Sequence, residues 1–516
     1  MTGTATTRVA GTTTSFDTDV IVVGGGPSGL AVAAELALAG VRVTVLERRT
    51  APVQSRAGTI LPRVLELLDA RGLAQTFIER ARKIRDNPLF RIHIWAGMQP
   101  VQWAHLDSRF GYRLILPQNE TEELLTDHAV SLGVTIVRGT TTETVEQDDD
   151  EVRIVATGRD GVKVRGRARY LVGADGGRST VRSQVGIDFV GHDATFTGIV
   201  ADVVIPNPWP EGRRMVDNER GWVTSFPFSS DHPVTRFNMV HTDRRGVGMS
   251  EPVTIDEVRQ CLHEILEFDL DFTELRWASR FGDAMRLADC FSAGRVFLVG
   301  ESARIHYPAS GVGMNFCLQD AFNLGWKLAA VVNGHASRIL LASYEAERRP
   351  VTEALLRSVE SQCAVQFDFT PEGVAFKRWF EKNLLPMPDV NRRLALELNG
   401  LVHPYPSPAG SHPMTGERAP DLELQTANGL ARIGELLRNQ EFLLIDCTGN
   451  QAYDDLSLSG APVRSVSGIP TGLPPSLHGV QSMLVRPDAY LAWVDSGVPE
   501  PQRAREELAQ WLDLLG

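Results

Sequence analysis

Asp19–Glu47, DVIVVGGGPSGLAVAAELALAGVRVTVLE, is the stretch that decides the fold of this 516-residue chain. Val20–Val23 is a short apolar run typical of a parallel strand buried on both faces, and Val41–Leu46 is a second such run. Between them lies a helical pattern that Gly40 is expected to end. The order strand, glycine turn, helix and strand predicts an α/β fold with a Rossmann-like unit.

Three glycines follow the first strand in the GxGxxG order, and each has a different physical task. Gly24 permits the tight turn, Gly26 lets the backbone approach a pyrophosphate, and Gly29 lets the helix pack closely on the strand. The start of the helix directs unpaired N–H groups and its positive dipole end at the phosphates. Glu47 lies about 20 residues further on, where a carboxylate accepts hydrogen bonds from an adenosine ribose. These residues predict a dinucleotide site and leave FAD and NAD both open.

Composition limits the class of partner. The formal charge of −12 argues against nucleic acid and against an anionic membrane surface, and the 43% apolar content allows well-packed cores. Five scattered cysteines without a CxxC pair predict neither a disulfide framework nor a metal site, which fits a cytoplasmic location. The Thr- and Gly-rich first 15 residues favour a disordered tail over a signal peptide. We therefore expect a small-molecule ligand and no membrane span.

Two later stretches repeat the pattern of strand, glycine turn and helix. In Tyr170–Ile187, YLVGADGGRSTVRSQVGI, an apolar strand leads to a turn at Asp175 and then to a helix. In Arg295–Gly334 a strand and a glycine-rich loop, Pro308 to Gly313, lead to a long helix that is expected to begin near Met314. Two such helix N-termini suit a ligand with two electron-rich ends, such as a pyrophosphate and an isoalloxazine ring.

The three stretches together resemble the FAD-dependent aromatic hydroxylases of the para-hydroxybenzoate hydroxylase fold, from about Asp17 to Pro350. The resemblance implies a Rossmann-like FAD-binding domain, an inserted β-sheet substrate domain and a thioredoxin-like C-terminal domain. The implied boundaries are 16–190 for the first part of the FAD-binding domain, with a substrate-domain excursion near 86–114, 191–287 for the substrate domain, 288–400 for the second FAD-binding part with following helices, and 401–516 for the C-terminal domain.

The resemblance also assigns residues to the cofactor. Asp175 matches the acid placed between FAD and a transient nicotinamide cofactor, and Gly300 with Glu301 matches the pair that holds the ribityl chain. A loop is implied under the pyrimidine edge of the flavin, where a side chain at Gly311 or Gly313 is expected to occupy the place of the ring or to strain the backbone. The implied cofactor-binding residues are Gly24, Gly26, Pro27, Ser28, Gly29, Glu47, Arg48, Arg56, Gln118, Thr142, Asp175, Gly300, Glu301, Pro308, Gly311, Val312, Gly313, Met314 and Asn315.

Two positions depart from the family pattern. Glu301 stands where Asp is usual, and Arg304 stands where many members carry His. His306 nearby is a weak catalytic candidate, and a histidine packed on the loop is the other reading. Arg56 is either a phosphate ligand or a solvated side chain. In the inserted sheet the candidate substrate-pocket walls, most of which are expected to be core, are Trp222, Phe226, Phe228, Phe237 and Met239.

The C-terminal region resembles the thioredoxin-like tail of phenol and polyketide hydroxylases. We expect a helix over residues 429–439, a strand at EFLLID, two strands around LVRPDAYLAWV and a helix ending at Leu515. Because Cys447 stands alone without a CxxC motif, packing or dimer support is favoured over a redox role.

By resemblance, the chain is an FAD-dependent monooxygenase that uses NADPH or NADH and O2. The family's chemistry would hydroxylate a phenolic ring, of polycyclic aromatic polyketide type, through a flavin C4a-hydroperoxide. A Baeyer–Villiger oxygenase on the same fold and a non-catalytic FAD-binding protein are the alternatives, and a flavin halogenase is disfavoured. The sequence leaves open the exact substrate and its regiochemistry, the substrate base, the choice between NADPH and NADH, and whether the protein is a monomer or a homodimer.

Overall fold

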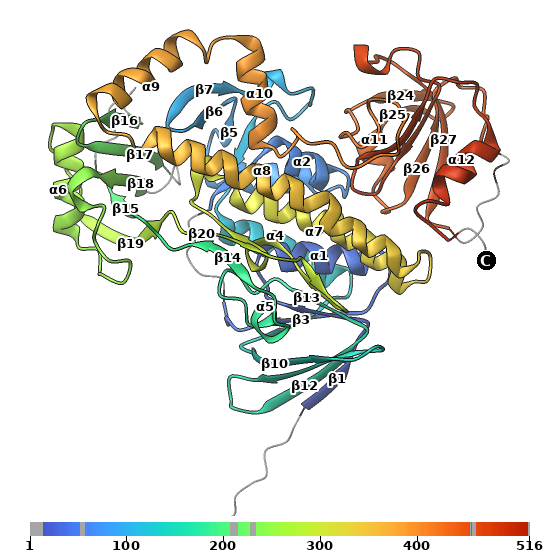
Figure 1. The fold of residues 1–516 in the computed structure, drawn as a ribbon, viewed down its shortest axis with the longest axis horizontal. Helices are drawn as coiled ribbons and strands as arrows, with labels where there is room; N and C mark the ends of the chain where they lie inside the picture. The colour runs from blue at the N-terminus through green and yellow to red at the C-terminus, as the bar shows by residue number, and fades with distance from the viewer. Residues whose placement is uncertain are drawn as a thin grey trace, which may run out of the picture.

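The computed structural model describes residues 14–51, 57–206, 215–227, 234–454, 456 and 461–513. Most of the expected N-terminal tail, Arg56 and Phe228 lie outside these residues. Figure 1 shows the arrangement: a core of strands and helices at the centre, a sheet with one covering helix at one side, and a C-terminal sheet at the other. Two long helices, α7 and α8, run through the middle between them.

The core is a six-stranded sheet with the order β21–β22–β13–β2–β3–β9, in which only the edge strand β21 is antiparallel. Its strands are β2 (Val20–Val23), β3 (Val43–Glu47), β9 (Thr135–Arg138), β13 (Tyr170–Gly173), β21 (Ser292–Ala293) and β22 (Val296–Leu298). Both expected strands of the opening stretch lie at its centre and are buried along their length. This burial explains why they read as continuous apolar runs.

Helices cover one face of this sheet, and α1 packs against both α4 and α7. The helices of the core are α1 (Pro27–Leu38), α2 (Pro62–Asp69), α3 (Ala74–Ile84), α4 (Gln118–Ser131), α5 (Thr180–Gln184) and α7 (Gly313–Val332). A four-stranded sheet with the order β1–β12–β11–β10 adjoins β2 and β3. Its strands are β1 (Thr14–Asp17), β10 (Thr141–Gln147), β11 (Val152–Thr157) and β12 (Lys163–Ala168).

The inserted domain is a five-stranded antiparallel sheet with the order β16–β17–β18–β15–β19, and α6 (Ile255–Leu266) covers one face. Its strands are β15 (Thr197–Val204), β16 (Met215–Asn218), β17 (Gly221–Pro227), β18 (Val234–His241) and β19 (Glu274–Gly282). Phe237 and Met239 pack in the cluster under α6. Trp222 belongs instead to the cluster on the other side, with Tyr307 and Phe367.

This division corrects the expected pocket walls. Alternate residues of a strand point to opposite faces, and Phe237 and Met239 lie in the core beneath α6, so for these two candidates the core reading holds and the pocket reading is wrong. Trp222 remains a candidate because it belongs to the cluster on the other side of the sheet.

Small sheets and helices join the core to the inserted domain. The β14–β20–β23 sheet comprises β14 (Phe189–His192), β20 (Met285–Ala288) and β23 (Arg304–Ile305), so the expected domain boundaries at 190 and 287 fall inside two paired strands. The expected excursion near 86–114 contains β5 (Leu89–Phe90), β6 (Ile92–Trp95), β7 (Met98–Gln102) and part of β8 (Arg113–Ile115), which also pairs with β4 (Thr59–Ile60). Helices α8 (Ala342–Gln366), α9 (Pro371–Asn383) and α10 (Pro388–Leu398) follow.

The C-terminal sheet has the order β25–β24–β27–β26–β28–β29. Its elements are β24 (Glu423–Thr426), β25 (Gly429–Arg432), α11 (Ile433–Leu436), β26 (Phe442–Asp446), β27 (Val463–Pro470), β28 (Ser482–Val485), β29 (Leu491–Asp495) and α12 (Pro501–Leu508). β26 pairs parallel with β27 and antiparallel with β28, which in turn pairs antiparallel with β29. The strand EFLLID and the two strands around LVRPDAYLAWV are confirmed.

The expected helix over residues 429–439 is wrong for its first half. Gly429 has a φ of +104° at the turn of a hairpin, and residues 429–432 pair with β24 as β25. Only α11, a single turn, follows. Cross-strand pairing, including the ion pair of Arg432 with Glu423, outweighs the helical propensity of the segment. The final helix also ends earlier than expected, at Leu508.

Cys447 is buried in the C-terminal domain. Burial raises the pKa of its thiol to about 12, so the sulfur stays protonated at neutral pH. All five cysteines are free thiols, and the expectation that this domain has no redox role stays a prediction.

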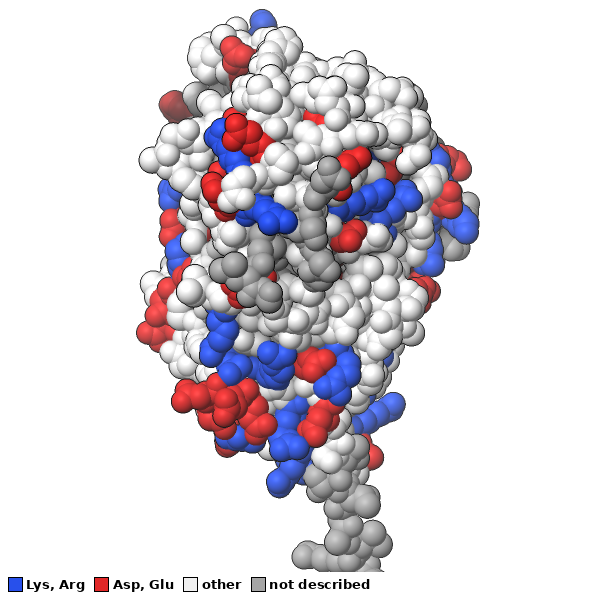
Figure 2. Space-filling model, turned by 90° about the vertical axis from the view of Figure 1, so that its right-hand side faces the viewer, with Lys and Arg blue, Asp and Glu red and all other residues white. Residues whose placement is uncertain are grey.

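The described part of the chain contains no helix long and apolar enough to cross a membrane. It also contains no cluster of three or more His, Cys, Asp or Glu side chains placed to hold a metal. Figure 2 shows acidic and basic side chains interleaved over the lower end of one face, around the β10–β12 sheet. Exposed ion pairs there include Arg153 with Asp148 and Lys163 with Glu143.

An aromatic contact fastens the C-terminal domain to α7, because the ring of Phe442 in β26 meets Trp326 edge-on with centroids 5.3 Å apart. We expect Phe442→Ala to lower the free energy of unfolding by about 3–5 kcal/mol, since the truncation leaves a cavity around a side chain that is 1% exposed. Denaturant unfolding measures this loss. Leu430→Ala, at a 58% exposed site in the same domain, is the control and should change it by less than about 0.5 kcal/mol. Equal losses would show that the contact contributes no special stability.

Candidate functional site

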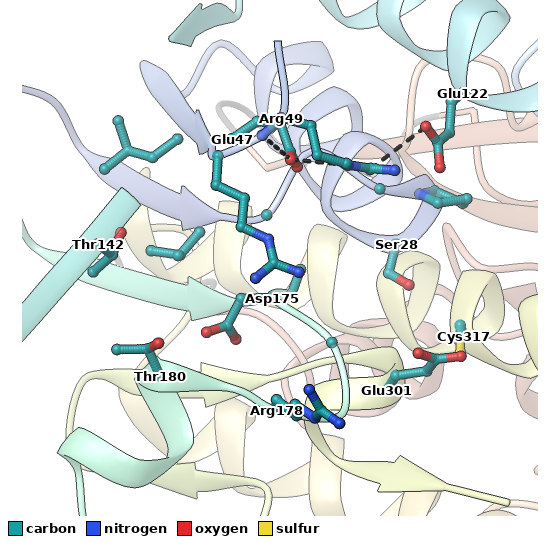
Figure 3. Close-up of a pocket in the computed structure, with 18 of the residues that line it drawn as sticks. Ser28, Glu47, Arg49, Glu122, Thr142, Asp175, Arg178, Thr180, Glu301 and Cys317 are labelled. Carbon is teal, nitrogen blue, oxygen red and sulfur yellow. Dashed lines mark hydrogen bonds and ion pairs between the residues drawn. The ribbon is translucent and has the colours of Figure 1, made fainter. Parts of the chain in front are cut away.

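A cavity of about 410 Å³ lies at the carboxyl ends of β2, β3 and β13, the edge where open α/β sheets bind ligands. Figure 3 shows it, with Glu47, Arg49 and Glu122 on one wall and Asp175, Arg178 and Glu301 on another. Its lining residues are Val23, Gly24, Gly26, Pro27, Ser28, Leu46, Glu47, Arg48, Arg49, Ala57, Gln118, Glu122, Thr140, Thr141, Thr142, Ala174, Asp175, Gly176, Arg178, Thr180, Glu301, Met314 and Cys317.

The three glycines of the first turn occupy three different environments. A Cβ atom at Gly24, whose φ is +109°, would lie 2.2 Å from the carbonyl oxygen of Ala174, and one at Gly29 would lie 1.9 Å from the carbonyl oxygen of Gly24. A Cβ atom at Gly26 would meet nothing within 4 Å. Gly24 and Gly29 therefore allow close backbone packing, whereas Gly26 leaves the pocket open in front of the helix.

The N-terminus of α1 faces this opening. Gly26 is its N-cap residue and Pro27 its first residue, and no described side chain caps the helix there. The first N–H groups of a helix have no partner within it, so they are available to an anion in the pocket.

Glu47 at the end of β3 is an ionised, buried carboxylate. Its Oε2 accepts a hydrogen bond from the Gly25 N–H at 2.6 Å, and its Oε1 accepts from the Arg49 backbone N–H at 2.7 Å and from Arg49 Nε at 3.0 Å. Burial by itself would raise the pKa of Glu47, but these hydrogen bonds lower it below the ordinary value. The carboxylate is thus fixed in place at the pocket wall, as an acceptor for a ligand hydroxyl.

Arg49 and Glu122 line the same wall and were missed from the sequence. Arg49 Nη2 lies 3.6 Å from Glu122 Oε2, while Gln118 Nε2 donates to Glu122 Oε1 at 2.8 Å. Gln118 and Glu122 are one helical turn apart on α4, which is a spacing that could have indicated the pair. Arg49 gave no such signal, because an arginine after a strand is common on any surface.

Asp175 lines the pocket, but its carboxylate is also a structural acceptor. Oδ1 accepts from the hydroxyls of Ser179 at 2.5 Å and Ser302 at 3.1 Å, and Oδ2 accepts from the Val181 N–H at 3.1 Å. The acid therefore ties the turn after β13 to the turn η3 (Gly300–Ser302). Arg178 precedes α5 and is exposed at the pocket wall.

Glu301 and Arg304 face different environments. Glu301 is exposed at the pocket wall, and its expected contact with the ribityl chain stays a prediction. Arg304 is 1% exposed and forms an ion pair with Asp320 of α7 inside the protein. At this position the chain therefore has a buried charge where the family pattern has a histidine. The Arg304 side chain is not part of the described pocket wall.

The loop before α7 reaches the pocket through Met314. Gly311 has a φ of +64°, which favours glycine, but a Cβ atom at Gly313 would lie 3.5 Å from the ring of His306 and meet no strain. The expectation that a side chain at Gly313 would strain the backbone is therefore wrong, whereas the expectation that it would occupy the place of the ring stays a prediction. Asn315 is fully buried and joins α7 to β4, accepting from the Leu61 N–H at 2.7 Å and donating to the Thr59 carbonyl at 3.0 Å.

The remaining assigned residues are placed as follows. Gly300 has a φ of +63° and Val312 is buried as the N-cap of α7, while Pro308 is exposed at the start of the loop. The described walls of the cavity do not include these three residues, Gly29, Gly311, Gly313 or Asn315. They shape the chain next to the cavity.

His306 is a neutral side chain at neutral pH. Burial lowers the pKa of its imidazole to about 4, against a smaller opposing effect of its contact with the Tyr307 carbonyl. Nδ1 lies 2.6 Å from that carbonyl oxygen and therefore carries the proton, which leaves Nε2 as an acceptor. This arrangement favours the packing role over that of a general base.

The residues fit an adenine dinucleotide. Gly26 leaves room for a pyrophosphate in front of an uncapped helix N-terminus, and Glu47 offers a fixed acceptor for ribose hydroxyls. Thr142, which is 7% exposed, lines the cavity with a hydroxyl that has no partner among the described residues. A polar ligand would satisfy that hydroxyl. Fold and site together define a protein that binds an adenine dinucleotide.

Comparison with known proteins identifies the family. Residues 17–359 match the FAD binding domain family, and residues 412–514 match the family described as aromatic-ring hydroxylase, C-terminal. The chain belongs to the FAD-dependent aromatic-ring hydroxylases. FAD is its cofactor, and the chain is an FAD-dependent monooxygenase acting on a small aromatic molecule.

Similar proteins match over almost the whole chain. An uncharacterized aromatic compound monooxygenase of Bacillus subtilis is 37% identical, covering 96% of this chain and 98% of that protein. The 12-dehydrotetracycline 5-monooxygenase/anhydrotetracycline 6-monooxygenase of Streptomyces rimosus is 37% identical with the same coverage. The structure of anhydrotetracycline hydroxylase from Streptomyces rimosus superposes with a TM-score of 0.86 at 35% identity, covering 96% of this chain and 99% of that chain.

The contrast between Gly26 and Gly24 gives a test of the cofactor site. We expect Gly26→Ala to leave the apoprotein folded and to weaken FAD at least about tenfold, because the methyl group takes space in front of the helix. Gly24→Ala should instead lower the stability of the apoprotein, because its Cβ atom would clash with the Ala174 carbonyl. Fluorescence titration with FAD and thermal unfolding of the apoprotein measure the two effects. Unchanged FAD affinity in the Gly26→Ala variant would show that the pyrophosphate does not bind in front of Gly26.

The lowered pKa of His306 gives a pH dependence with a defined sign. The unfolded chain binds a proton at this residue below about pH 6.5, whereas the folded chain does so only below about pH 4, so this group destabilises the fold as the pH falls through that window. We expect His306→Gln to lose less stability than the parent between about pH 7.5 and about pH 5. Denaturant midpoints at both pH values measure the difference. His263→Gln, at an exposed site, is the control, and an equal gain there would contradict the assignment.

Proposed function

We propose that the enzyme uses NAD(P)H and O2 to hydroxylate the phenolic ring of a polycyclic, aromatic polyketide-type molecule. The observation that carries this proposal is an FAD-fitting pocket in a chain that aligns end to end with relatives named for the oxygenation of tetracycline precursors. The match includes the C-terminal domain, so the resemblance is not confined to the nucleotide-binding half.

The residues of the chain bind and orient the cofactor in this proposal. The N–H groups at the start of α1 hold the diphosphate, Glu47 accepts the ribose hydroxyls, and Glu301 contacts the ribityl chain. The uncapped N-terminus of α7, with no described side chain bonded to it, supplies N–H groups and a positive dipole end toward the ring. Bound FAD supplies the redox chemistry, accepting a hydride and activating O2 for transfer of one oxygen atom.

An aromatic cluster between the inserted sheet and the flavin loop is the proposed substrate face. Tyr307 next to the loop packs edge-on against Phe367 at 5.3 Å, and Phe196 does so at 4.7 Å. Trp222 and Phe281 complete the cluster. Flat polycyclic rings can pack against such aromatic side chains in stacked or edge-on arrangements. The apolar surroundings would exclude water from the reacting carbon.

The nicotinamide cofactor is proposed to bind transiently beside Asp175. The turn that carries this acid also presents Arg178, an exposed cation at the pocket wall that suits a phosphate. The parallel sheet of the core provides the single GxGxxG unit already assigned to FAD.

A test of the reaction follows from oxygen and electron balance. With an anthraquinone-type or tetracycline-type phenol, we expect NADPH or NADH oxidation, O2 uptake and one 18O atom from 18O2 in a product that keeps its ring system. Mass spectrometry and NMR measure the product, and parallel assays with the two nucleotides identify the reductant. The apoprotein, from which FAD has been removed, is the control. It should show no nucleotide oxidation, no O2 uptake and no 18O incorporation.

The main alternative is a Baeyer–Villiger oxygenase on the same fold. It would also incorporate one oxygen atom, but the oxygen would be inserted beside a ketone carbonyl. The product would be an ester, or a ring-expanded lactone, which treatment with base would hydrolyse. A lactone from a ketone substrate would replace the hydroxylation proposal. FAD-loaded protein that oxidises neither nucleotide, with or without aromatic phenols, would contradict both.

A further inference from the structure

Two clusters of buried charges surround α7, and they differ in their balance. The first cluster joins α7 to α8 and the C-terminal domain with two cations and two anions, Lys327, Arg486, Glu347 and Asp488. The second cluster has two cations, Arg304 and Arg348, and one anion, Asp320.

Asp320 is the shared partner in the second cluster. Its Oδ2 accepts from Arg304 and from the Gly300 N–H, the latter at 3.3 Å, and its Oδ1 accepts from Arg348 Nε at 2.8 Å. Asp320 and Arg348 are 0% exposed and Arg304 is 1% exposed. All three side chains are therefore shielded from bulk solvent.

The second cluster carries one positive charge in excess. In the described part of the chain, neither Arg304 nor Arg348 forms an ion pair with a second carboxylate. Nε and Nη2 of Arg304 and Nη2 of Arg348 also have no hydrogen-bond partner among the described residues. Arg348 Nη1 donates only to a neutral group, the hydroxyl of Tyr405, at 3.2 Å. An uncompensated buried charge is costly, so its presence calls for a compensating negative charge nearby.

The FAD pocket lies directly beside this cluster. Arg304 follows the η3 turn that carries Glu301, and Asp320 lies one helical turn after Cys317 on α7. Glu301 and Cys317 both line the pocket, and Figure 3 shows them together on one wall. A charge in this low-dielectric region acts across the wall with little screening.

We propose that the unbalanced pair Arg304 and Arg348 raises the reduction potential of bound FAD by stabilising the negative charge that the cofactor acquires on two-electron reduction. This role rests on the proposed function only in its use of the reduced cofactor, because FAD binding itself follows from the family. Neither arginine lines the pocket, so both act through space rather than as catalytic residues.

The test compares Arg304→Met with Arg304→Lys. Methionine removes the excess charge and leaves Asp320 paired one to one with Arg348, so the variant is expected to fold, whereas lysine retains the charge. In Arg304→Met, the preference of the protein for reduced over oxidised FAD should fall about tenfold, which lowers the two-electron midpoint potential by about 30 mV. Arg304→Lys should keep a potential close to that of the parent.

The potential is measured by dithionite titration of FAD-loaded protein with a reference dye, without NADPH or aromatic substrate. Failure of the proposed function therefore leaves this measurement intact. The absorption spectrum of the reduced form adds an independent readout: loss of the positive charge should raise the pKa of the bound reduced flavin by about one unit. A purely structural role would move FAD loading or thermal stability without moving these two quantities.

A second variant and a matched control complete the design. Arg348→Met also leaves one balanced pair, Arg304 with Asp320, and should lower the potential in the same direction, which decides the question if Arg304→Met does not fold. The double variant Glu35→Gln/Arg71→Met removes a balanced buried pair and should leave the potential unchanged. Unchanged potentials in both methionine variants, or equal decreases in Arg304→Met and Arg304→Lys, would overturn the proposal.

Discussion

Helix α7 is buried along almost its whole length between the nucleotide-binding core, α8 and the C-terminal domain. Every residue from Asn315 to Val332 is buried, although Asp320, Asn323 and Lys327 are polar. Such groups are tolerated only when the protein itself pairs them. Lys327 Nζ and Asn323 Nδ2 both donate to Glu347 Oε2 of α8 at 2.7 Å, and the same carboxylate accepts both Nη groups of Arg486 from the C-terminal domain. The helix that begins at the FAD pocket is therefore tied to two other parts of the chain.

Through this pairing the C-terminal domain stabilises the nucleotide-binding half, a role that requires no redox chemistry. Arg486 bridges Glu347 and Asp488 and lies over the rings of Trp326 and Tyr405. The domain thus supplies the cation that Glu347 requires in addition to Lys327. Removing one partner of a buried ion pair costs about 3–5 kcal/mol, because the other charge is left uncompensated. The domain belongs to the structural support of the nucleotide-binding half, and its sheet needs no cysteine pair for that task.

The sequence predicted the parts of the fold that local patterns encode. The strands and glycines of Asp19–Glu47 were readable because apolar runs, turn glycines and the acid spacing are all local. Phe237 and Met239 were misassigned because an aromatic sequence does not tell which face of a sheet is covered by a helix. The hairpin at Gly429 was missed because pairing with β24 is a tertiary effect. Arg49 lies at the pocket wall, where it forms an ion pair with Glu122. The two residues are about 70 positions apart along the chain, so local sequence spacing could not predict their contact.

The buried charges of α7 also show why an apolar helix would serve this protein less well. Replacing buried ion pairs with well-packed apolar side chains is often neutral or stabilising, so stability alone does not explain their retention. An apolar interface, however, tolerates small shifts of a helix along its axis. Asp320, Asn323 and Lys327 can form their hydrogen bonds and ion pairs only when the helix lies at one axial position. The first turn of α7 contributes Met314 to the FAD pocket, and displacements of about 1 Å matter at a reacting centre. The ion pairs therefore favour a single position of α7, and with it a single position of Met314 in the wall of the pocket.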